Sequence, residues 1–299
     1  MHLTAEDVEK LLDLDELIAA MRDALIALSA GKVVQPVRSV LTTDQPPGWF
    51  ALMPAILGDV MGAKLVTVFP QNAGTSLHTH QAVILLFSAK TGEPLATLDG
   101  RVITAWRTAA VSALATQALA PPDARVLTIL GSGVQARTHL TALRRVQPFP
   151  DVRVWSRNLE HAQAFAQETG AQMMPLEAAV READVICTVT HSSEAFVRGE
   201  WLKPRVHLNA VGAVGLVHRE LHDAVMQNAA VVVEEHAAAM KESTEIVSSG
   251  SAIYAELGEL LSQTKARPTS LKTVYKSLGV AVEDIGAARM IWQKAKIRL

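Results

Sequence analysis

Residues 125–136, RVLTILGSGVQA, decide the fold predicted for this chain, because an apolar run leads there into a glycine turn. The nearly continuous hydrophobic run before Gly131 is typical of a parallel strand covered on both faces. The turn matches the pattern GxGxxA, in which Gly131 allows a tight reversal, Gly133 lets the backbone approach a pyrophosphate, and Ala136 lets a helix pack closely. Amide groups at the start of that helix would face two phosphates.

A second predicted strand, residues 152–155, follows the turn after a spacer of helical length. Strand, turn, helix and strand together form a βαβ unit, whereas an ordinary glycine turn needs no such context. The unit therefore predicts a dinucleotide-binding domain. The turn residues expected to contact the cofactor are Gly131, Ser132, Gly133, Val134 and Gln135.

The end of the second strand bears on the choice of cofactor. An NAD enzyme usually places a carboxylate there to hold the ribose 2′-hydroxyl, but this chain has Ser156, Arg157 and Asn158. Arg157 suits a 2′-phosphate, and its alternative interpretation is a solvated surface residue. The sequence predicts NADP(H) over NAD(H), with use of NAD(H) left open.

Composition limits the classes of protein to consider. The chain has 299 residues, of which 49% are hydrophobic, and a formal net charge of −2 without a long basic run. It can bury a core of two domains, and nucleic acid is not an expected partner. No run approaches the ~18 apolar residues of a membrane span, and residues 1–16 do not form a signal peptide. With Cys187 as its single cysteine, in an apolar run, we expect a cytoplasmic protein.

The segment before the glycine turn combines helix and strand patterns. Thr4 is an N-cap candidate for apolar positions that recur at helical spacing as far as Leu28, and Thr91-Gly92 predicts a hairpin turn. Residues 103–119 predict a helix rich in small side chains, which Pro121-Pro122 ends. The strands predicted in between are residues 33–41, 49–57, 63–69, 80–87 and 94–98.

After the turn, strand and helix patterns alternate as in an open, doubly wound sheet. We predict an α/β fold in which a Rossmann domain, residues 122–273, is joined to a discontinuous α+β domain, residues 1–121 and 274–299. The last helix would pack on that first domain or across a dimer interface. The predicted elements are a helix at 159–168, strands at 184–189, 206–211 and 230–233, and after Glu234 only helices, at 251–261 and 273–295.

Basic side chains in the first domain are candidates for chemistry. Arg38 and Lys64 each interrupt an apolar strand, so each must be exposed, be paired or bind an anion. Arg107 lies near the start of the predicted helix, where the helix dipole disfavours a cation unless an anion shares the site. His78 and His80 would share one strand face, but no third ligand lies nearby, so a metal site is not expected. A nucleophile elbow is also absent from the sequence.

Several ordered motifs resemble the ornithine cyclodeaminase and mu-crystallin family over nearly the whole chain. So many motifs in the same order identify a family far more specifically than the glycine turn alone does. The motifs are residues 35–38 (QPVR), 53–54 (MP), 63–67 (AKLVT), 80–82 (HQA), 99–100 (DG), 103–110 (ITAWRTAA), 131–136 (GSGVQA), 207–213 (HLNAVGA) and 276–279 (KSLG).

The resemblance implies a homodimer whose first domain binds the substrate and forms the dimer, with the substrate lying between that domain's basic residues and the nicotinamide. It assigns Arg38, Lys64 and Arg107 to the substrate α-carboxylate, and Met53 and His80 to the substrate pocket. Lys64 and Arg107 are the catalytic candidates. Outside the glycine turn, the resemblance implies further cofactor contacts at Ser156, Arg157, Asn158, Thr190, Val211 and Ser277.

One departure bears on the reaction. Cyclodeaminases and similar alanine dehydrogenases carry Asp two residues after the glycine of the NAVG segment, where this chain has Val214. An isopropyl group cannot take a proton from an amine. The resemblance is therefore closest to ketimine reductases, which would reduce Δ1-pyrroline-2-carboxylate or Δ1-piperideine-2-carboxylate to L-proline or L-pipecolate with NADPH. Lys64 is the candidate proton donor. The alternatives are an ornithine cyclodeaminase, an amino-acid dehydrogenase, or a non-catalytic NADPH-binding protein.

Overall fold

The computed structural model describes residues 1–215 and 218–298 and divides the chain into two compact units. The first unit is Met1–Arg107 with Gly279–Leu299, and the second is Thr108–Leu278. Leu299, the last residue of the predicted first domain, lies outside the described residues. The predicted boundaries at 121/122 and 273/274 differ from these. The reason is that helix α3 (Gly100–Leu119) is continuous, so the chain enters the second unit inside it and not at the proline pair.

A mixed sheet of seven strands forms the base of the first unit. The strands are β1 (His2–Leu3), β2 (Val33–Val34), β3 (Ser39–Asp44), β4 (Pro47–Leu57), β5 (Val60–Val68), β6 (His80–Ser88) and β7 (Pro94–Asp99). Their order is β1-β7-β6-β5-β4-β2, with β3 on β4. The predicted hairpin is confirmed, because β6 and β7 pair antiparallel. A short 3₁₀ helix, Pro70–Asn72, precedes β6.

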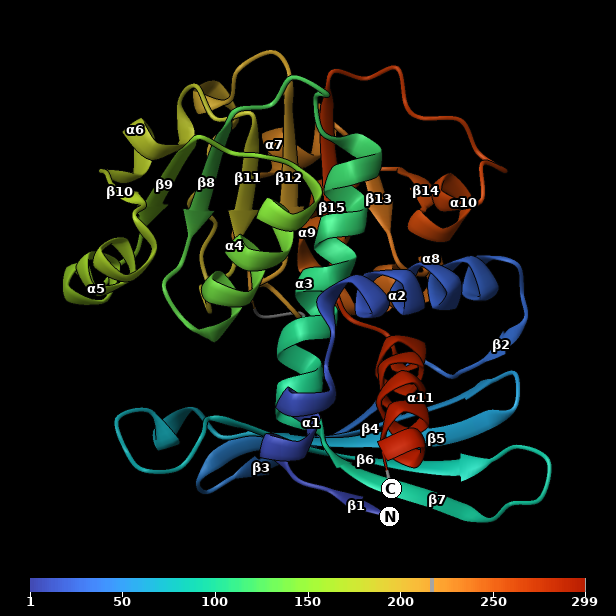
Figure 1. Cartoon of the computed structure of the whole chain (residues 1–299). Coiled ribbons are helices and arrows are strands. Elements are labelled where there is room, and N and C mark those ends of the chain that lie inside the picture. The colour runs from blue at the N-terminus through green and yellow to red at the C-terminus, as the bar shows by residue number, and fades with distance from the viewer. Residues whose placement is uncertain (216–217, 299) are drawn as a thin grey trace. The chain divides into compact units, whose positions relative to one another are not determined.

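Helices cover one face of this sheet. Figure 1 shows α11 (Ala281–Arg298) standing on the sheet, and it packs against β4, β5, β6 and α2 (Leu14–Ser29). The last helix therefore belongs to the first unit, which was one of the two predicted alternatives. In the first turn of α11, Asp284 meets Lys64 of β5, one of the residues that the sequence singled out.

Two N-terminal predictions need correction. The helical pattern from Thr4 to Leu28 is two helices, α1 (Ala5–Leu11) and α2, because the Asp13 side chain caps α2 by accepting from the amides of Asp15 and Glu16. The strand predicted at 33–41 is likewise two short strands, β2 and β3. Residues 35–38 connect them, so Arg38 lies outside any strand.

The second unit is an eight-stranded sheet in which every neighbouring pair is parallel. The strands are β8 (Val126–Leu130), β9 (Asp151–Trp155), β10 (Gln172–Met173), β11 (Val185–Thr188), β12 (Val206–Ala210), β13 (Ala230–Val233), β14 (Ile253–Glu256) and β15 (Lys272–Lys276). The strands are ordered β10-β9-β8-β11-β12-β15-β13-β14. From β8 the chain first adds β9 and β10 on one side and then crosses over to add β11 and β12 on the other, so the side changes between β8 and β11. Ligands of open parallel sheets bind at such a switch point, outside the carboxyl ends of the strands. The predicted Rossmann fold class is confirmed.

The helices of this unit connect successive strands. The glycine turn leads from β8 directly into α4, as predicted from the GxGxxA pattern. The helices are α4 (Val134–Val146), α5 (Leu159–Thr169), α6 (Leu176–Val180), α7 (Asp223–Gln227), α8 (His236–Glu242), α9 (Thr244–Ser249), α10 (Leu257–Leu261) and the 3₁₀ turn Gly199–Trp201.

The prediction of only helices after Glu234 was wrong. Ile253–Glu256 is strand β14 and Lys272–Lys276 is strand β15, which lies inside the sheet between β12 and β13. The sequence KTVYK does not read as a core strand, because both of its ends are charged. Both Tyr275 and Lys276 are nevertheless buried, because their polar ends meet carboxylates. Tyr275 donates to Glu234, and Lys276 pairs with Glu245.

Within residues 1–215 and 218–298, no helix combines the length and the apolar character needed to cross a membrane.

Candidate active site and cofactor edge

Lys64 lies on β5 opposite Met53 of β4 and Ile84 of β6, on the face that α11 covers. Its side chain is 2% exposed, and its Nζ lies 2.7 Å from Oδ2 of Asp284. Lys64, a charge that interrupts an apolar strand in the sequence, is therefore buried and paired. Burial lowers the pKa of Lys64 to about 8, although Asp284 raises it against that effect.

Arg107 lies well inside α3, because that helix begins at Gly100, where the Asp99 side chain accepts from the amides of Arg101 and Val102. Arg107 therefore does not lie near the helix start, where the sequence predicted it. Arg107 does share its site with anions, however. Its Nη1 lies 2.6 Å from Oε2 of Glu283 and its Nε 3.0 Å from Oδ1 of Asp284.

Arg38 joins this group through the chain segment that leads into α11. Its Nη2 donates to the carbonyl oxygen of Gly279 at 2.6 Å. Gly279 has a φ of +71°, and a Cβ there would lie 2.4 Å from Nη1 of Arg107. Only glycine lets this backbone lie so close to the guanidinium group.

His80 and Met53 border the same cations. His80 is the first residue of β6 and is half-buried; burial, Lys64 and Arg107 lower its pKa to about 4, so it is neutral at physiological pH. Met53 is buried, with its Sδ 3.9 Å from Nη1 of Arg38. The structure thus brings all five predicted substrate residues into one unit. Among the described residues, no three His, Cys, Asp or Glu side chains gather to hold a metal ion.

Sequence reasoning missed Glu283 and Asp284. They pair with the buried cations Lys64 and Arg107. The signal was an acidic pair in the first turn of an otherwise largely apolar helix start, AVEDIGAA. Two adjacent carboxylates that are 1% and 0% exposed require buried cations as partners. The two carboxylates thus compensate the buried charges of Lys64 and Arg107.

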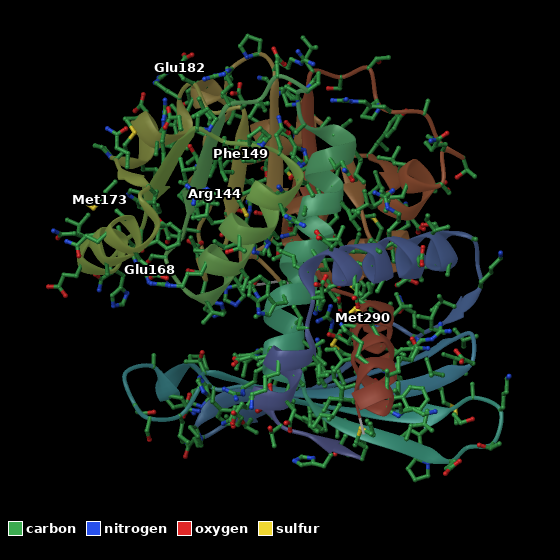
Figure 2. The ribbon with its side chains drawn as sticks, viewed as in Figure 1. Arg144, Phe149, Glu168, Met173, Glu182 and Met290 are labelled. Carbon is green, nitrogen blue, oxygen red and sulfur yellow. The ribbon has the colours of Figure 1, made fainter. Side chains whose placement is uncertain are left out.

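The glycine turn of the second unit has the form that a pyrophosphate needs. Gly131 has a φ of +128°, and a Cβ there would lie 2.8 Å from the carbonyl oxygen of Val189. Gly133 precedes α4 and has no side chain to cap the first amides, so those amides can face an anion. Arg137 donates to the Ser132 carbonyl at 2.7 Å and pairs with Glu168, which Figure 2 labels, and this holds the turn in place.

The residues after β9 also fit a dinucleotide. Ser132 donates its hydroxyl hydrogen to Oγ of Ser156 at 3.0 Å, which ties the turn to this segment. Arg157 is exposed and makes no ion pair or hydrogen bond with another described residue. Asn158 caps α5 by accepting from the amide of His161. Val134 and Gln135 begin α4, exposed and half-buried respectively.

A buried carboxylate joins the ends of β11 and β12. Glu220 accepts from the hydroxyl of Thr188, from the amide and hydroxyl of Thr190, and from the amide of Gly212, at 2.6 to 2.8 Å. Val211 donates its amide to the Thr188 carbonyl at 3.0 Å. Thr190 and Val211, both predicted cofactor contacts, therefore lie on one braced edge. Sequence reasoning missed Glu220, which no motif marks.

A second buried group supports the same edge. Lys276 pairs with Glu245 at 2.9 Å and donates to the Ala213 carbonyl at 2.5 Å. Val214, which follows Ala213, packs against the core of this unit. Ser277 is buried, and its hydroxyl donates to Glu234 at 3.0 Å, so the structure gives this predicted cofactor residue a carboxylate partner within the protein.

These features define an oxidoreductase-type fold with a dinucleotide edge on one unit and a buried group of cations and carboxylates on the other. The chain belongs to the ornithine cyclodeaminase/mu-crystallin family, whose model matches residues 1–298. This confirms the resemblance seen in the sequence motifs.

Individual relatives agree with that assignment. The ketimine reductase mu-crystallin of Mus musculus is 42% identical over 97% of this chain and 96% of the relative. A structure of Thermococcus litoralis Δ1-pyrroline-2-carboxylate reductase with NADH and L-proline is 32% identical, has a TM-score of 0.94, and is matched over 100% and 98% of the two chains. An archaeal alanine dehydrogenase dimer with bound NAD is 30% identical, with a TM-score of 0.94 over 100% and 96%. The chain is a full-length homologue of ketimine reductases and an NAD(P)H-type oxidoreductase.

Proposed function

We propose that this protein reduces cyclic imino acids that carry a 2-carboxylate, such as Δ1-pyrroline-2-carboxylate or Δ1-piperideine-2-carboxylate, to L-proline or L-pipecolate. The observation that carries the proposal is the cluster of three cations in the first unit, with Lys64 and Arg107 buried and Arg38 half-buried, which suits a substrate that carries a carboxylate. Full-length homology to ketimine reductases supports the same reaction.

In this proposal the protein orients the substrate and manages one proton. Arg107 and Arg38 hold the carboxylate, because guanidinium groups match its geometry. Lys64 gives a proton to the ring nitrogen, and a pKa of about 8 leaves most of it protonated at neutral pH. When bound, the reduced nicotinamide supplies the hydride to the imine carbon. His80 is neutral and adds no further positive charge.

Val214 supports reduction over deamination. An apolar side chain packed against the core offers no base that could take a proton from an amine. The alternatives are an ornithine cyclodeaminase, an amino-acid dehydrogenase, or a protein that binds NADPH without turnover.

An assay of NADPH oxidation separates these functions. The panel contains the two cyclic imines, pyruvate with ammonia, and pyruvate with methylamine; the reverse direction is tested with L-proline and ornithine. We expect turnover of the cyclic imines and no release of ammonia from ornithine. Ammonia release would favour the cyclodeaminase, ammonia-dependent reduction of pyruvate the dehydrogenase, and NADPH binding without any turnover the binding protein.

The preference for NADPH is proposed on Arg157, whose exposed guanidinium group has no described partner and follows the strand that meets the adenosine ribose in Rossmann folds. We expect Arg157→Ala to raise KM for NADPH about tenfold or more and to leave KM for NADH within about twofold. Steady-state kinetics with both cofactors tests this. Equal effects on the two cofactors would contradict the role of Arg157.

We also propose a homodimer formed through the outer face of the first unit's sheet. The apolar side chains on this face are Val34, Leu41, Phe50, Leu52 and Ile56, with exposures of 37% to 67%. A relative of the same fold is a dimer. Light scattering should give a dimer mass for the wild type and for Leu159→Lys on the second unit, but a monomer mass for Leu52→Lys. A dimeric Leu52→Lys variant would exclude this face.

A further inference from the structure

Asp284 contacts both catalytic candidates. Its Oδ2 lies 2.7 Å from Nζ of Lys64, and its Oδ1 lies 3.0 Å from Nε of Arg107. None of these three side chains is more than 4% exposed. A carboxylate that is buried between two cations stabilises the charged form of each and fixes their separation.

The position of Asp284 on α11 supports this arrangement. Asp284 and Glu283 lie in the first turn, where the positive end of the helix dipole favours carboxylates. The Gln35 side chain accepts from the amide of Val282 at 2.9 Å, which holds the start of the helix in place. Glu283 pairs with Arg107 from the neighbouring position. The two adjacent carboxylates thus share Arg107, and Asp284 pairs with Lys64 as well.

We propose that Asp284 is a positioning residue that keeps Lys64 protonated and directs its ammonium group for transfer of a proton to the substrate nitrogen. The inference rests on the proposed reduction. In that step the imine carbon gains a hydride from the reduced cofactor, and the electron pair of the broken C=N π bond moves to nitrogen. An N–H bond of Lys64 breaks as the ring N–H bond forms, and neutral Lys64 regains its proton from water.

The charges around Lys64 explain why Asp284 is needed. The groups facing it are Asp284 from α11, Arg107 from α3, Arg38 from residues 35–38, and neutral His80 from β6. Burial lowers the pKa of Lys64, Asp284 raises it, and Arg107 and Arg38 lower it. Without the Asp284 carboxylate, the remaining effects all favour neutral Lys64, which cannot donate a proton.

The first test is the pH profile of kcat/KM for cyclic-imine reduction in Asp284→Asn. Because proton donation requires charged Lys64, activity falls as pH rises through its pKa. We expect this basic limb to move at least one pH unit towards acid in Asp284→Asn, with kcat/KM at least tenfold lower at pH 8 and a smaller difference at pH 6. Asp284→Glu keeps the charge and should keep the wild-type limb at a reduced rate.

Glu283→Gln is the matched control, because it removes the neighbouring buried carboxylate that pairs with Arg107. It should lower kcat/KM at every pH without moving the limb. Equal loss of activity at all pH values in Asp284→Asn, with an unmoved limb, would overturn the proposal.

A second measurement does not depend on turnover. The Cε signal of Lys64 in protein labelled with ¹³C-lysine, assigned with Lys64→Arg, should titrate at lower pH in Asp284→Asn than in the wild type. An unchanged titration would overturn the proposal. If the wild type reduces no cyclic imine but the Lys64 titration shifts, the proposed reaction is wrong while control of the Lys64 charge by Asp284 is established.

Discussion

Gly279 shows how one residue controls the geometry of a charged group. Its carbonyl oxygen accepts from Arg38, and its bare Cα leaves space for the guanidinium group of Arg107. Both cations are therefore positioned by a residue without a side chain. The motif KSLG, residues 276–279, marked this position in the sequence, but only contacts explain why it is glycine.

A pair of glycine substitutions separates backbone strain from this close approach. Gly279→Ala and Gly31→Ala both place alanine at a φ near +70°, but a Cβ at Gly31 meets no atom within 4 Å. We expect each to lower the free energy of unfolding by about 1 kcal/mol. Only Gly279→Ala should also lower kcat/KM for imine reduction, by about tenfold or more, or ~1.4 kcal/mol.

Urea denaturation and steady-state kinetics on the two variants check this. Full activity in Gly279→Ala would show that Arg107 does not need its observed position. Inactivity in Gly31→Ala would show that strain alone accounts for the loss.

At the scale of elements, Glu220 braces the carboxyl ends of β11 and β12. Burial and Glu245 raise its pKa, whereas the hydroxyls of Thr190 and Thr188 and the charge of Lys276 oppose that rise. Its two oxygens accept four N–H or O–H donors, an arrangement that an ionised carboxylate satisfies fully. Glu220 therefore fixes the spacing of the two loops that carry Thr190 and Val211.

Glu220→Gln should loosen this edge. The amide replaces one acceptor oxygen by a donor, so buried donors of Thr188, Thr190 or Gly212 lose their partner at about 1–3 kcal/mol each. We expect a loss of about 2–4 kcal/mol in the free energy of unfolding. Urea denaturation measures this loss, and Glu177→Gln, in an exposed pair with Arg181, should change stability by less than about 1 kcal/mol. Unchanged stability in Glu220→Gln would mean that the carboxyl group is protonated in the native protein.

Elements differ in how well the sequence predicted them. Strands β8, β11 and β12 are apolar along most of their length and were predicted close to their observed bounds. Strand β15 was missed, because the side chains of Tyr275 and Lys276 are polar while their burial depends on Glu234 and Glu245. A local pattern reports hydrophobicity, and it cannot report a partner that folding brings from a distant part of the chain.

At the scale of the whole molecule, histidines with lowered pKa values link stability to pH. In the second unit, Nδ1 of His139 donates to the Gln135 carbonyl and its Nε2 accepts from Ser112, which fixes a neutral tautomer. Burial lowers the pKa of His139 to about 4 and that of His207 to about 3. In the first unit, burial and the nearby cations lower the pKa of His80 to about 4.

These histidines predict loss of stability in mild acid. Their folded-state pKa values lie below the unfolded value near 6.5, so their contribution is complete above pH 6.5 and is lost as pH falls towards 4. Each can reduce the free energy of unfolding by about 1.4 kcal/mol per pH unit in that range. Urea denaturation from pH 7.5 to 5 measures the slope. His139→Gln should be less stable at pH 7.5 and lose less on acidification, and an identical slope would contradict a neutral buried His139.

The sequence by itself determined the fold class and the glycine turn that leads from β8 into α4. A strand, a glycine turn, a helix and a second strand depend on contacts between near neighbours, which residues 125–136 and 152–155 specify locally. It also identified Arg38 and Lys64 as unusual, because a charge in an apolar run requires an explanation, and it singled out Arg107 through its expected place near a helix start.

Only the tertiary structure decided how those charges are compensated. Arg107 meets Asp284 across 177 positions of sequence, after the chain has completed the second unit and returned in α11. Electrostatic pairing depends on distance in space, and no periodicity or composition encodes which buried carboxylate will lie beside which cation. The charge balance of the candidate site, and with it the protonation of Lys64, is therefore a property of the folded chain.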